Sequence, residues 1–178
     1  MNTRKKTAAL RALGTAVAAL ALVAGVQASP AAADDIPGFA YKNLNSGRVL
    51  EVGGWSTANG ALVNQWDYHG GANQQWAADG HWYGSQWWGM EKSAHTGKCL
   101  DVAGWSKDNG ATVHMWDCHG GDNQQWDEHY ISDNVFYLIN KNSGKCLEIA
   151  GWSKVNGARA QQWTCTGGTN QMWTLIPE

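Results

Sequence analysis

Residues 50–76 read LEVGGWSTANGALVNQWDYHGGANQQW, and the same pattern returns at residues 100–126 and again at residues 147–173. In each copy the closing Trp lies 26 positions after the opening Leu, and 13 of the 27 residues are identical in all three copies. Chance does not produce such agreement at a fixed register. The chain therefore contains one structural unit written three times.

A secretory signal peptide is predicted for residues 1–33. Arg4 and Lys5 belong to a basic opening, an Ala/Leu/Val run follows over residues 16–26, and residues 31–33 offer three small side chains to a signal peptidase. The apolar run is too short to span a bilayer, which disfavours the alternative of a retained membrane anchor. We therefore expect a secreted, extracellular protein.

The remaining residues, 34–178, have the length of a single domain with a real core. They carry a formal net charge of about −6, because the basic residues of the N-terminal segment are removed. This charge favours neither nucleic acid nor an anionic membrane as a partner. We expect no nucleic-acid binding, no membrane insertion and a monomeric protein. The unusual feature is Trp, because all 12 lie in this part of the chain.

The cysteines form two pairs, each 19 positions apart, at the same places in the second and third repeats: Cys99, Cys118, Cys146 and Cys165. Val49 and Tyr68 occupy both equivalent places in the first repeat. This joint loss favours bonds within a repeat over the other two connectivities. Each disulfide would close a loop of about twenty residues and contribute roughly 3 kcal/mol. Zinc is the alternative, since His119 follows Cys118, but closely spaced ligands such as Cys-x-x-Cys are missing. We predict no metal and no cofactor.

Short strands and tight turns are predicted throughout the repeats. Gly-containing turns open a strand at residues 45–47, 95–97 and 142–144, and Asn-Gly pairs follow at residues 59–60, 109–110 and 156–157. Apolar residues alternate between the turns, and no stretch of residues 34–178 has helical periodicity. The predicted fold class is all-β.

Strand alternation sorts the side chains by face. If Leu100 and Val102 point into the core, Asp101 points outward; if Trp126 is core, Asn123 lies on the opposite face. One side of each repeat then presents a carboxylate, a polar side chain, an aromatic ring and an amide: Glu51, Asn64, Trp66 and Asn73; Asp101, His114, Trp116 and Asn123; Glu148, Gln161, Trp163 and Asn170.

This set of groups suits a sugar. A carboxylate accepts hydrogen bonds from two neighbouring hydroxyls, an amide both donates and accepts, and a Trp face packs on the C–H bonds of a pyranose ring. An alternative stays open at this point. Trp66, Trp116 and Trp163 could lie in the core, and the amides could satisfy loop backbone.

These motifs resemble the ricin B-type lectin family, also described as family 13 carbohydrate-binding modules. The resemblance rests on residues 99–102 (CLDV), on Trp116 fifteen positions after the acid, on Cys118, and on a closing Gln-x-Trp at Gln74, Gln124 and Gln171. It covers about residues 38–177. It implies a β-trefoil of three four-stranded lobes, closed by a six-stranded barrel, with the Trp of each Gln-x-Trp in the core. The expected lobes are about residues 38–87, 88–134 and 135–178.

The resemblance also implies up to three shallow sugar pockets, one per lobe. It places sugar-binding residues at Glu51, Asn64, Trp66, Asn73 and Gln74 in lobe one, at Asp101, His114, Trp116, Asn123 and Gln124 in lobe two, and at Glu148, Gln161, Trp163, Asn170 and Gln171 in lobe three. Two departures concern the acid, which is Asp in the family but Glu51 and Glu148 here, and the amide, which His114 replaces. The expected ranking of the lobes is three, then two, then one.

Two further aromatic sets have two possible roles each. Trp55, Trp105 and Trp152 follow the acid by four positions in every repeat, and they would form either a second wall of each pocket or a plug beneath the lobe. Trp82, Tyr83, Trp87 and Trp88 lie between lobes one and two, and they would either pack within strands or form an exposed platform for a longer glycan.

We predict a secreted carbohydrate-binding protein that is not an enzyme and binds galactose-type or xylan-type glycans. A glycosidase needs two carboxylates about 5 to 9.5 Å apart, whereas Glu51, Asp101 and Glu148 belong to different lobes. No Gly-x-Ser-x-Gly elbow supplies a nucleophile, so no catalytic residue is predicted. The alternative is a secreted protein-binding trefoil, such as a protease or hydrolase inhibitor. Repeated loops favour repeated ligand pockets over that alternative.

Overall fold

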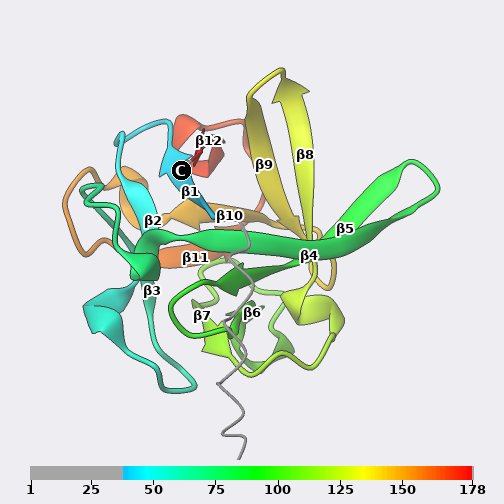
Figure 1. The fold of residues 1–178 in the computed structure, drawn as a ribbon. Helices are drawn as coiled ribbons and strands as arrows, with labels where there is room; N and C mark the ends of the chain where they lie inside the picture. Colours follow the sequence, from blue (N-terminus) through cyan, green and yellow to red (C-terminus); the bar gives the residue numbers. More distant parts are fainter. Residues whose placement is uncertain (1–37, 178) are drawn as a thin grey trace, which may run out of the picture. The chain divides into compact units, whose positions relative to one another are not determined.

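The computed structural model describes residues 38–177, so the predicted signal peptide lies outside the described residues. Twelve β-strands follow one another along this part of the chain (Figure 1): β1 (Phe39–Asn43), β2 (Val49–Val52), β3 (Val63–Trp66), β4 (Trp76–Tyr83), β5 (Gln86–Ser93), β6 (Cys99–Val102), β7 (Val113–Trp116), β8 (Trp126–Ser132), β9 (Val135–Asn140), β10 (Cys146–Ile149), β11 (Ala160–Trp163) and β12 (Trp173–Pro177).

Three-residue 3-10 turns are the other regular elements: η1 (Gly53–Trp55), η2 (Ala72–Gln74), η3 (Ala103–Trp105), η4 (Asp122–Gln124), η5 (Ala150–Trp152) and η6 (Thr169–Gln171). Two of them occur at the same places in every repeat. Among residues 38–177, no helix has the length and apolar character that a membrane span requires.

Six strands close into a barrel by antiparallel pairing in a ring. β1 pairs with β4, β4 with β5, β5 with β8, β8 with β9, β9 with β12, and β12 with β1. The other six form the hairpins β2–β3, β6–β7 and β10–β11. Isolated bridges such as Leu62 with His114 and Thr112 with Gln161 join these hairpins to one another. The predicted all-β trefoil is therefore confirmed.

The closing Trp of each repeat lies at the centre of the core, as predicted. Trp76, Trp126 and Trp173 are fully buried and are the largest side chains in the core cluster. Each indole Nε1 donates a hydrogen bond to the carbonyl of the Leu that opens the same repeat, at 3.0 to 3.2 Å. The constant spacing of 26 residues is explained by this contact, which ties the end of each repeat to its beginning.

Both predicted disulfides are present. Cys99 is bonded to Cys118, and Cys146 to Cys165, with Cα–Cα distances of 5.1 and 5.2 Å. Each bond joins the first residue of a hairpin strand to the loop that follows the partner strand. Because Cys118 is bonded in this way, the zinc alternative for this residue is wrong.

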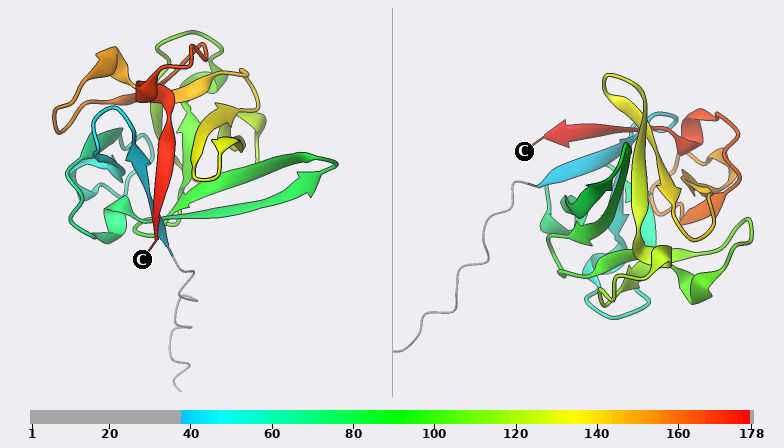
Figure 2. Two further views of the ribbon diagram at one scale, coloured as in Figure 1. Left: turned by 90° about the horizontal axis from the view of Figure 1, so that it is seen from above. Right: turned by 90° about the vertical axis from the view of Figure 1, so that its right-hand side faces the viewer.

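The β4–β5 hairpin projects from the barrel, as the green ribbon in Figure 1 and Figure 2 shows. Each of its strands has eight residues. Gly80 faces Gly89 across the hairpin, and a Cβ added to Gly80 would lie 2.4 Å from the Gly89 Cα. Trp82 and Tyr83 near the tip are exposed, whereas Trp87 and Trp88 are half-buried. Packing within the strands is therefore not the whole role of this aromatic set.

Candidate functional site

Each lobe has one open cavity at the outer side of its hairpin. The volumes are about 270 Å³ in lobe one, 310 Å³ in lobe two and 270 Å³ in lobe three. The lining residues correspond from lobe to lobe: Glu51, Gly54, Trp55, Asn64, Trp66, His69 and Asn73; Asp101, Gly104, Trp105, His114, Trp116, His119 and Asn123; Glu148, Gly151, Trp152, Gln161, Trp163 and Thr166.

An acid forms the floor of every cavity. Glu51, Asp101 and Glu148 are only 3 to 6% exposed, because the cavity walls rise around them. Each acid lies directly opposite a polar residue on the neighbouring strand: Asn64, His114 and Gln161. Directly opposite residues on an antiparallel pair have their side chains on the same face. The predicted pairing of acid and polar side chain is thus a consequence of the hairpin register.

In lobe two, two imidazoles and an amide surround the carboxylate. His114 Nε2 lies 3.0 Å from Asp101 Oδ1, and Asn123 Nδ2 donates to Asp101 Oδ2 at 2.9 Å. His119 Nε2 lies 3.4 Å from the same Oδ2. A carboxylate has about four lone-pair sites, so Asp101 keeps capacity for a further donor.

In lobe three, the carboxylate of Glu148 accepts hydrogen bonds from three side-chain amides. Glu148 accepts hydrogen bonds from Gln161 at 2.7 Å, Gln171 at 2.9 Å and Asn170 at 3.2 Å. The extra methylene of Glu brings its carboxylate within reach of Gln171. The Gln161 carbonyl in turn accepts from Arg159 at 2.8 Å, so this amide is engaged at both ends.

Lobe one has a looser arrangement. Gln74 and Asn73 donate to Glu51 Oε2 at 3.2 and 3.4 Å, and His69 Nε2 lies 3.7 Å from it. Burial raises the pKa of Glu51 above its ordinary value, although the Gln74 hydrogen bond and the nearby imidazole oppose the rise. The side-chain carbonyl oxygen of Asn64 is buried and has no hydrogen-bond partner among the described residues.

Two Trp rings border each cavity. The first ring is 38 to 41% exposed in Trp66, Trp116 and Trp163, so the alternative that these residues lie in the core is wrong. The second ring comes from the 3-10 turn after the acid, and it is 51 to 54% exposed: Trp55, Trp105 and Trp152. These three line the cavities, and the alternative of a plug beneath the lobe is wrong.

The second ring is held in a strained backbone conformation. Trp55, Trp105 and Trp152 have φ of 54 to 55°, the left-handed region that non-glycine residues rarely adopt. The backbone carbonyl of each Trp bonds a side chain from the turn of another lobe: His95, Asn142 and Asn45, at 3.0 to 3.1 Å. Such strain persists only where surrounding contacts enforce it, and it concentrates at functional sites.

The family follows from a comparison with known proteins. Residues 39–173 match the ricin-type beta-trefoil lectin domain. The chain belongs to this family. The lectin domain spans most of the described residues, and the three cavities are equivalent positions within it.

Solved structures with this fold include a designed threefold-symmetric protein and a natural enzyme. The designed protein ThreeFoil is 37% identical, with a TM-score of 0.74 over 78% of this chain and 97% of that chain. An exo-beta-1,3-galactanase from Clostridium thermocellum is 32% identical, with a TM-score of 0.76 over 82% of this chain. The match covers only 31% of the galactanase, so the lectin domain corresponds to less than a third of that enzyme.

A third similar structure is the C-half of an earthworm R-type lectin, solved in complex with GalNAc. It shares the fold at 23% identity and a TM-score of 0.61, over 80% of this chain and 99% of that chain. Together with the family match, the lectin neighbours support carbohydrate binding as the class of function of this domain.

The structure adds one residue per lobe that the sequence reasoning missed. His69, His119 and Thr166 line the lectin cavities, each three positions after the exposed Trp of its repeat. The sequence feature that could have identified these residues is their shared position in the repeat, directly before the Gly-Gly pair. In lobes one and two the second Trp stacks on this His, with ring centroids 6.2 and 5.9 Å apart.

The Gln of each Gln-x-Trp lies behind the cavity, whereas the family resemblance implied a contact with sugar. Gln74, Gln124 and Gln171 are fully buried behind the cavity wall and line none of the three cavities. Each carboxamide oxygen accepts the backbone N–H of the missed residue, at 2.8 to 2.9 Å. These glutamines therefore position His69, His119 and Thr166 instead of facing a ligand.

A 3-10 turn, instead of the strand that the sequence predicted, carries the Asn-Gln pair that precedes the core Trp of each repeat. Asn123 and Gln124 belong to η4, and both are buried. Asn123 still reaches its acid, as do Asn73 and Asn170 from η2 and η6. The lining set of lobe three, however, does not include Asn170, which supports Glu148 from behind.

Proposed function

We propose that this domain is an exported, non-enzymatic lectin whose three cavities each bind one pyranose unit. One observation carries the proposal: in every lobe a buried carboxylate lies between two exposed Trp rings. The carboxylate accepts hydrogen bonds from vicinal hydroxyls, and the rings pack on the C–H face of the sugar. Export is supported by the two disulfides, which persist in oxidising compartments.

Galactose-containing glycans are the first candidate ligands. The galactanase that is 32% identical to this chain acts on a beta-1,3-galactan by its name. Two other proteins of this fold were solved with GalNAc and with lactose, although their low identity supports only the fold. Xylan-type ligands are the second candidate class.

Lobe two is proposed to bind most strongly, whereas the ranking expected from the sequence placed lobe three first. Asp101 and Glu148 each meet three polar groups, so the difference lies in what these groups are: two imidazoles and an amide in lobe two, and three amides in lobe three. In lobe three the amide of Gln161 is already engaged by Glu148 and Arg159. A ligand that bonds the Gln161 carbonyl would have to displace Arg159, whereas the hydrogen bond to Asp101 is the one described for the His114 imidazole.

Binding by a single lobe is expected to be weak. A shallow cavity with a few hydrogen bonds corresponds to a dissociation constant of about 0.1 to 1 mM. Two or three lobes that engage one polysaccharide would gain avidity without new contacts.

The test is a glycan and polysaccharide array on residues 34–178, followed by calorimetry with the free sugar that competes. Single variants Trp66→Ala, Trp116→Ala and Trp163→Ala remove one exposed ring per lobe. We expect each variant to lose one binding site, with the largest loss of affinity from Trp116→Ala. A folded protein that binds no glycan on the array would refute the proposal and direct the search to a protein partner.

A further inference from the structure

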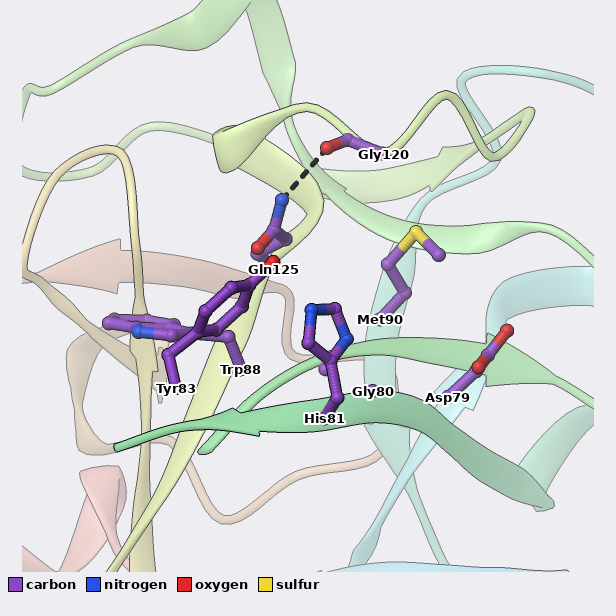
Figure 3. Close-up of a pocket in the computed structure, with 9 residues that line it drawn as sticks. Asp79, Gly80, His81, Tyr83, Trp88, Met90, Gly120 and Gln125 are labelled. Carbon is purple, nitrogen blue, oxygen red and sulfur yellow. Dashed lines mark hydrogen bonds between the residues drawn. The ribbon is translucent and has the colours of Figure 1, made fainter. Parts of the chain in front are cut away.

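A fourth cavity lies between the β4–β5 hairpin and the loop that follows Cys118 (Figure 3). Its volume is about 360 Å³, larger than that of any of the three lobe cavities. Neither the sequence repeat nor the acid of any lobe accounts for it. It is lined by Asp79, Gly80, His81, Tyr83, Trp88, Gly89, Met90, Gly120 and Gln125.

One face of the hairpin supplies the aromatic wall. His81 lies directly opposite Trp88 in the hairpin register, and the rings of His81 and Tyr83 have centroids 4.3 Å apart. Figure 3 shows His81, Tyr83 and Trp88 standing on the hairpin and facing Gln125. Trp82 and Trp87 pair with each other on the opposite face, with centroids 5.8 Å apart.

A lysine of lobe three, Lys141, contacts this aromatic wall. Lys141 Nζ lies 5.7 Å from the Tyr83 ring centroid and 5.8 Å from that of Trp88. The same ammonium bonds the side chains of Asp122 and Gln125, at 3.0 and 2.9 Å. A cation held between two rings and two loop side chains keeps the hairpin and the loop together.

The cavity shares its loop with the cavity of lobe two. His119 and Asn123 face lobe two, whereas Gly120 and Gln125 face the hairpin. Gly120, in this loop, has a φ of 71°, and a Cβ added there would meet no heavy atom within 4 Å. The neighbouring Gly121 lies under the Trp105 ring, where a Cβ would be 2.5 Å from that ring. Glycine at both positions therefore leaves this part of the loop without side chains.

We propose that the hairpin cavity is an extension subsite of lobe two, which binds further units of a glycan chain whose first unit occupies the Asp101 cavity. This inference rests on the proposed function and deepens it, because it gives lobe two a preference for oligosaccharides over single sugars. Consecutive residues of one loop, His119 and Gly120, line the two cavities, so we expect one glycan chain to reach both.

The chemistry of the cavity matches that of a sugar site. It offers aromatic faces, the carboxylate of Asp79, the imidazole of His81 and the amide of Gln125. Gln125 donates one N–H to the Gly120 carbonyl at 2.8 Å and keeps its second N–H for a ligand. Stacking rings with a few polar groups are general features of small-ligand cavities of this size.

The experiment isolates lobe two in the double variant Trp66→Ala/Trp163→Ala, so that avidity between lobes does not contribute. Calorimetry measures its dissociation constants for β-1,3-linked galacto-oligosaccharides of one to four units, with xylo-oligosaccharides of the same lengths as a second series. We expect the dissociation constant to fall at least fivefold from one unit to three. Adding Trp88→Ala should abolish this gain and leave the single-sugar affinity unchanged.

Trp82→Ala in the same background is the matched control, because it removes an equal ring from the opposite face of the hairpin. It should retain the gain with chain length. Thermal unfolding of both variants confirms that they are folded. As an independent readout, the indole N–H resonance of Trp88 should shift with the trisaccharide and not with the single sugar.

The outcomes separate this inference from the proposed function. A single sugar that binds with no gain from longer chains overturns the extension subsite alone, as does a gain that survives Trp88→Ala. If neither series binds the double variant at any length, sugar binding by lobe two is wrong and the extension subsite falls with it.

Discussion

Each repeat has one Trp that is exposed at a cavity and another Trp that is buried in the core. Trp163 lies with one face open at the cavity of lobe three, whereas Trp173, ten positions later, is fully buried and bonded to the Leu147 carbonyl. Truncation should therefore have different effects at the two positions. The difference depends on burial and not on the side chain itself.

Trp173→Ala should lower the free energy of unfolding by about 3 to 5 kcal/mol, because it leaves a cavity in the core. Trp163→Ala should lower it by less than about 1 kcal/mol, since surface substitutions rarely cost more. Denaturant unfolding of the two variants beside the unchanged protein measures both values. Equal losses would mean that the exposed ring also supports the fold.

Residues that repeat could be predicted from the sequence, and residues that do not repeat could not. The threefold pattern identified the core Trp, the acids and their polar partners, and the joint loss of two cysteines in lobe one indicated the disulfide pairing. Strand alternation placed Asp101 beside His114 correctly. It also placed Asn123 on the cavity side, whereas the sugar-binding role of Gln124 was implied by the family resemblance alone.

At the scale of single elements, the lobe hairpins differ in whether a disulfide ties them. Val49 occupies the place of Cys99, and its pairing with Trp66 repeats the pairing of Cys99 with Trp116. Tyr68 occupies the place of Cys118 and is exposed. The backbone of lobe one thus follows the course that carries a disulfide elsewhere, but without the bond.

Val49→Cys with Tyr68→Cys should form a third disulfide in lobe one. A bond that closes a loop of about twenty residues should raise the free energy of unfolding by roughly 2 to 3 kcal/mol, less the packing lost at Val49. Denaturant unfolding without reductant compares the double variant with the unchanged protein, because reductant would also cleave the two native disulfides. The Val49→Cys single variant gives the packing loss. A double variant no more stable than this single variant would contradict the prediction.

The aromatic residues of the β4–β5 hairpin lie outside the repeat pattern, so the repeat does not predict their arrangement. The four clustered aromatics were recognisable in the sequence, but their division between two faces depends on the register in which Trp82 faces Trp87 and His81 faces Trp88. That register follows from the turn at Gly84, and a shift by one residue would exchange the faces. The cavity beside Gln125 also needs a loop from the next lobe, and no local pattern predicts that contact.

At the scale of the whole molecule, barrel closure brings three groups together from positions far apart in the chain. The hydroxyl of Tyr41, on β1, lies 2.5 Å from Glu91 Oε2 on β5 and 2.9 Å from Glu128 Oε1 on β8. A phenol has one proton and can donate it to only one carboxylate. The arrangement is satisfied when Glu91 is protonated and donates to the Tyr41 oxygen, while Tyr41 donates to Glu128.

Burial is the main cause that raises the pKa of Glu91 to about 8, and the charge of Glu128 adds to the rise. Burial and the same two acids hold the pKa of Tyr41 well above its ordinary value, so the phenol stays neutral. An unfolded chain releases the Glu proton near pH 4.3. Between that pH and about 8, the folded protein therefore binds one more proton than the unfolded chain.

The free energy of unfolding should consequently fall as pH rises through this window. The contribution of Glu91 is complete below the pKa of the unfolded chain and is lost by about pH 8, with a slope of at most about 1.4 kcal/mol per pH unit. Glu91→Gln keeps the shape and removes the titration, so its stability should depend less on pH. Denaturant unfolding at intervals from pH 5 to 9 measures both profiles.

Asp133→Asn is the matched control, because it removes one carboxylate from an exposed position and should leave the slope unchanged. A profile of Glu91→Gln that runs parallel to that of the unchanged protein would show that Glu91 is ionised in the folded state. Tyr41 would then donate its single proton to only one of the two carboxylates. The pH profile therefore tests whether Glu91 carries a proton beside Tyr41 in the folded protein.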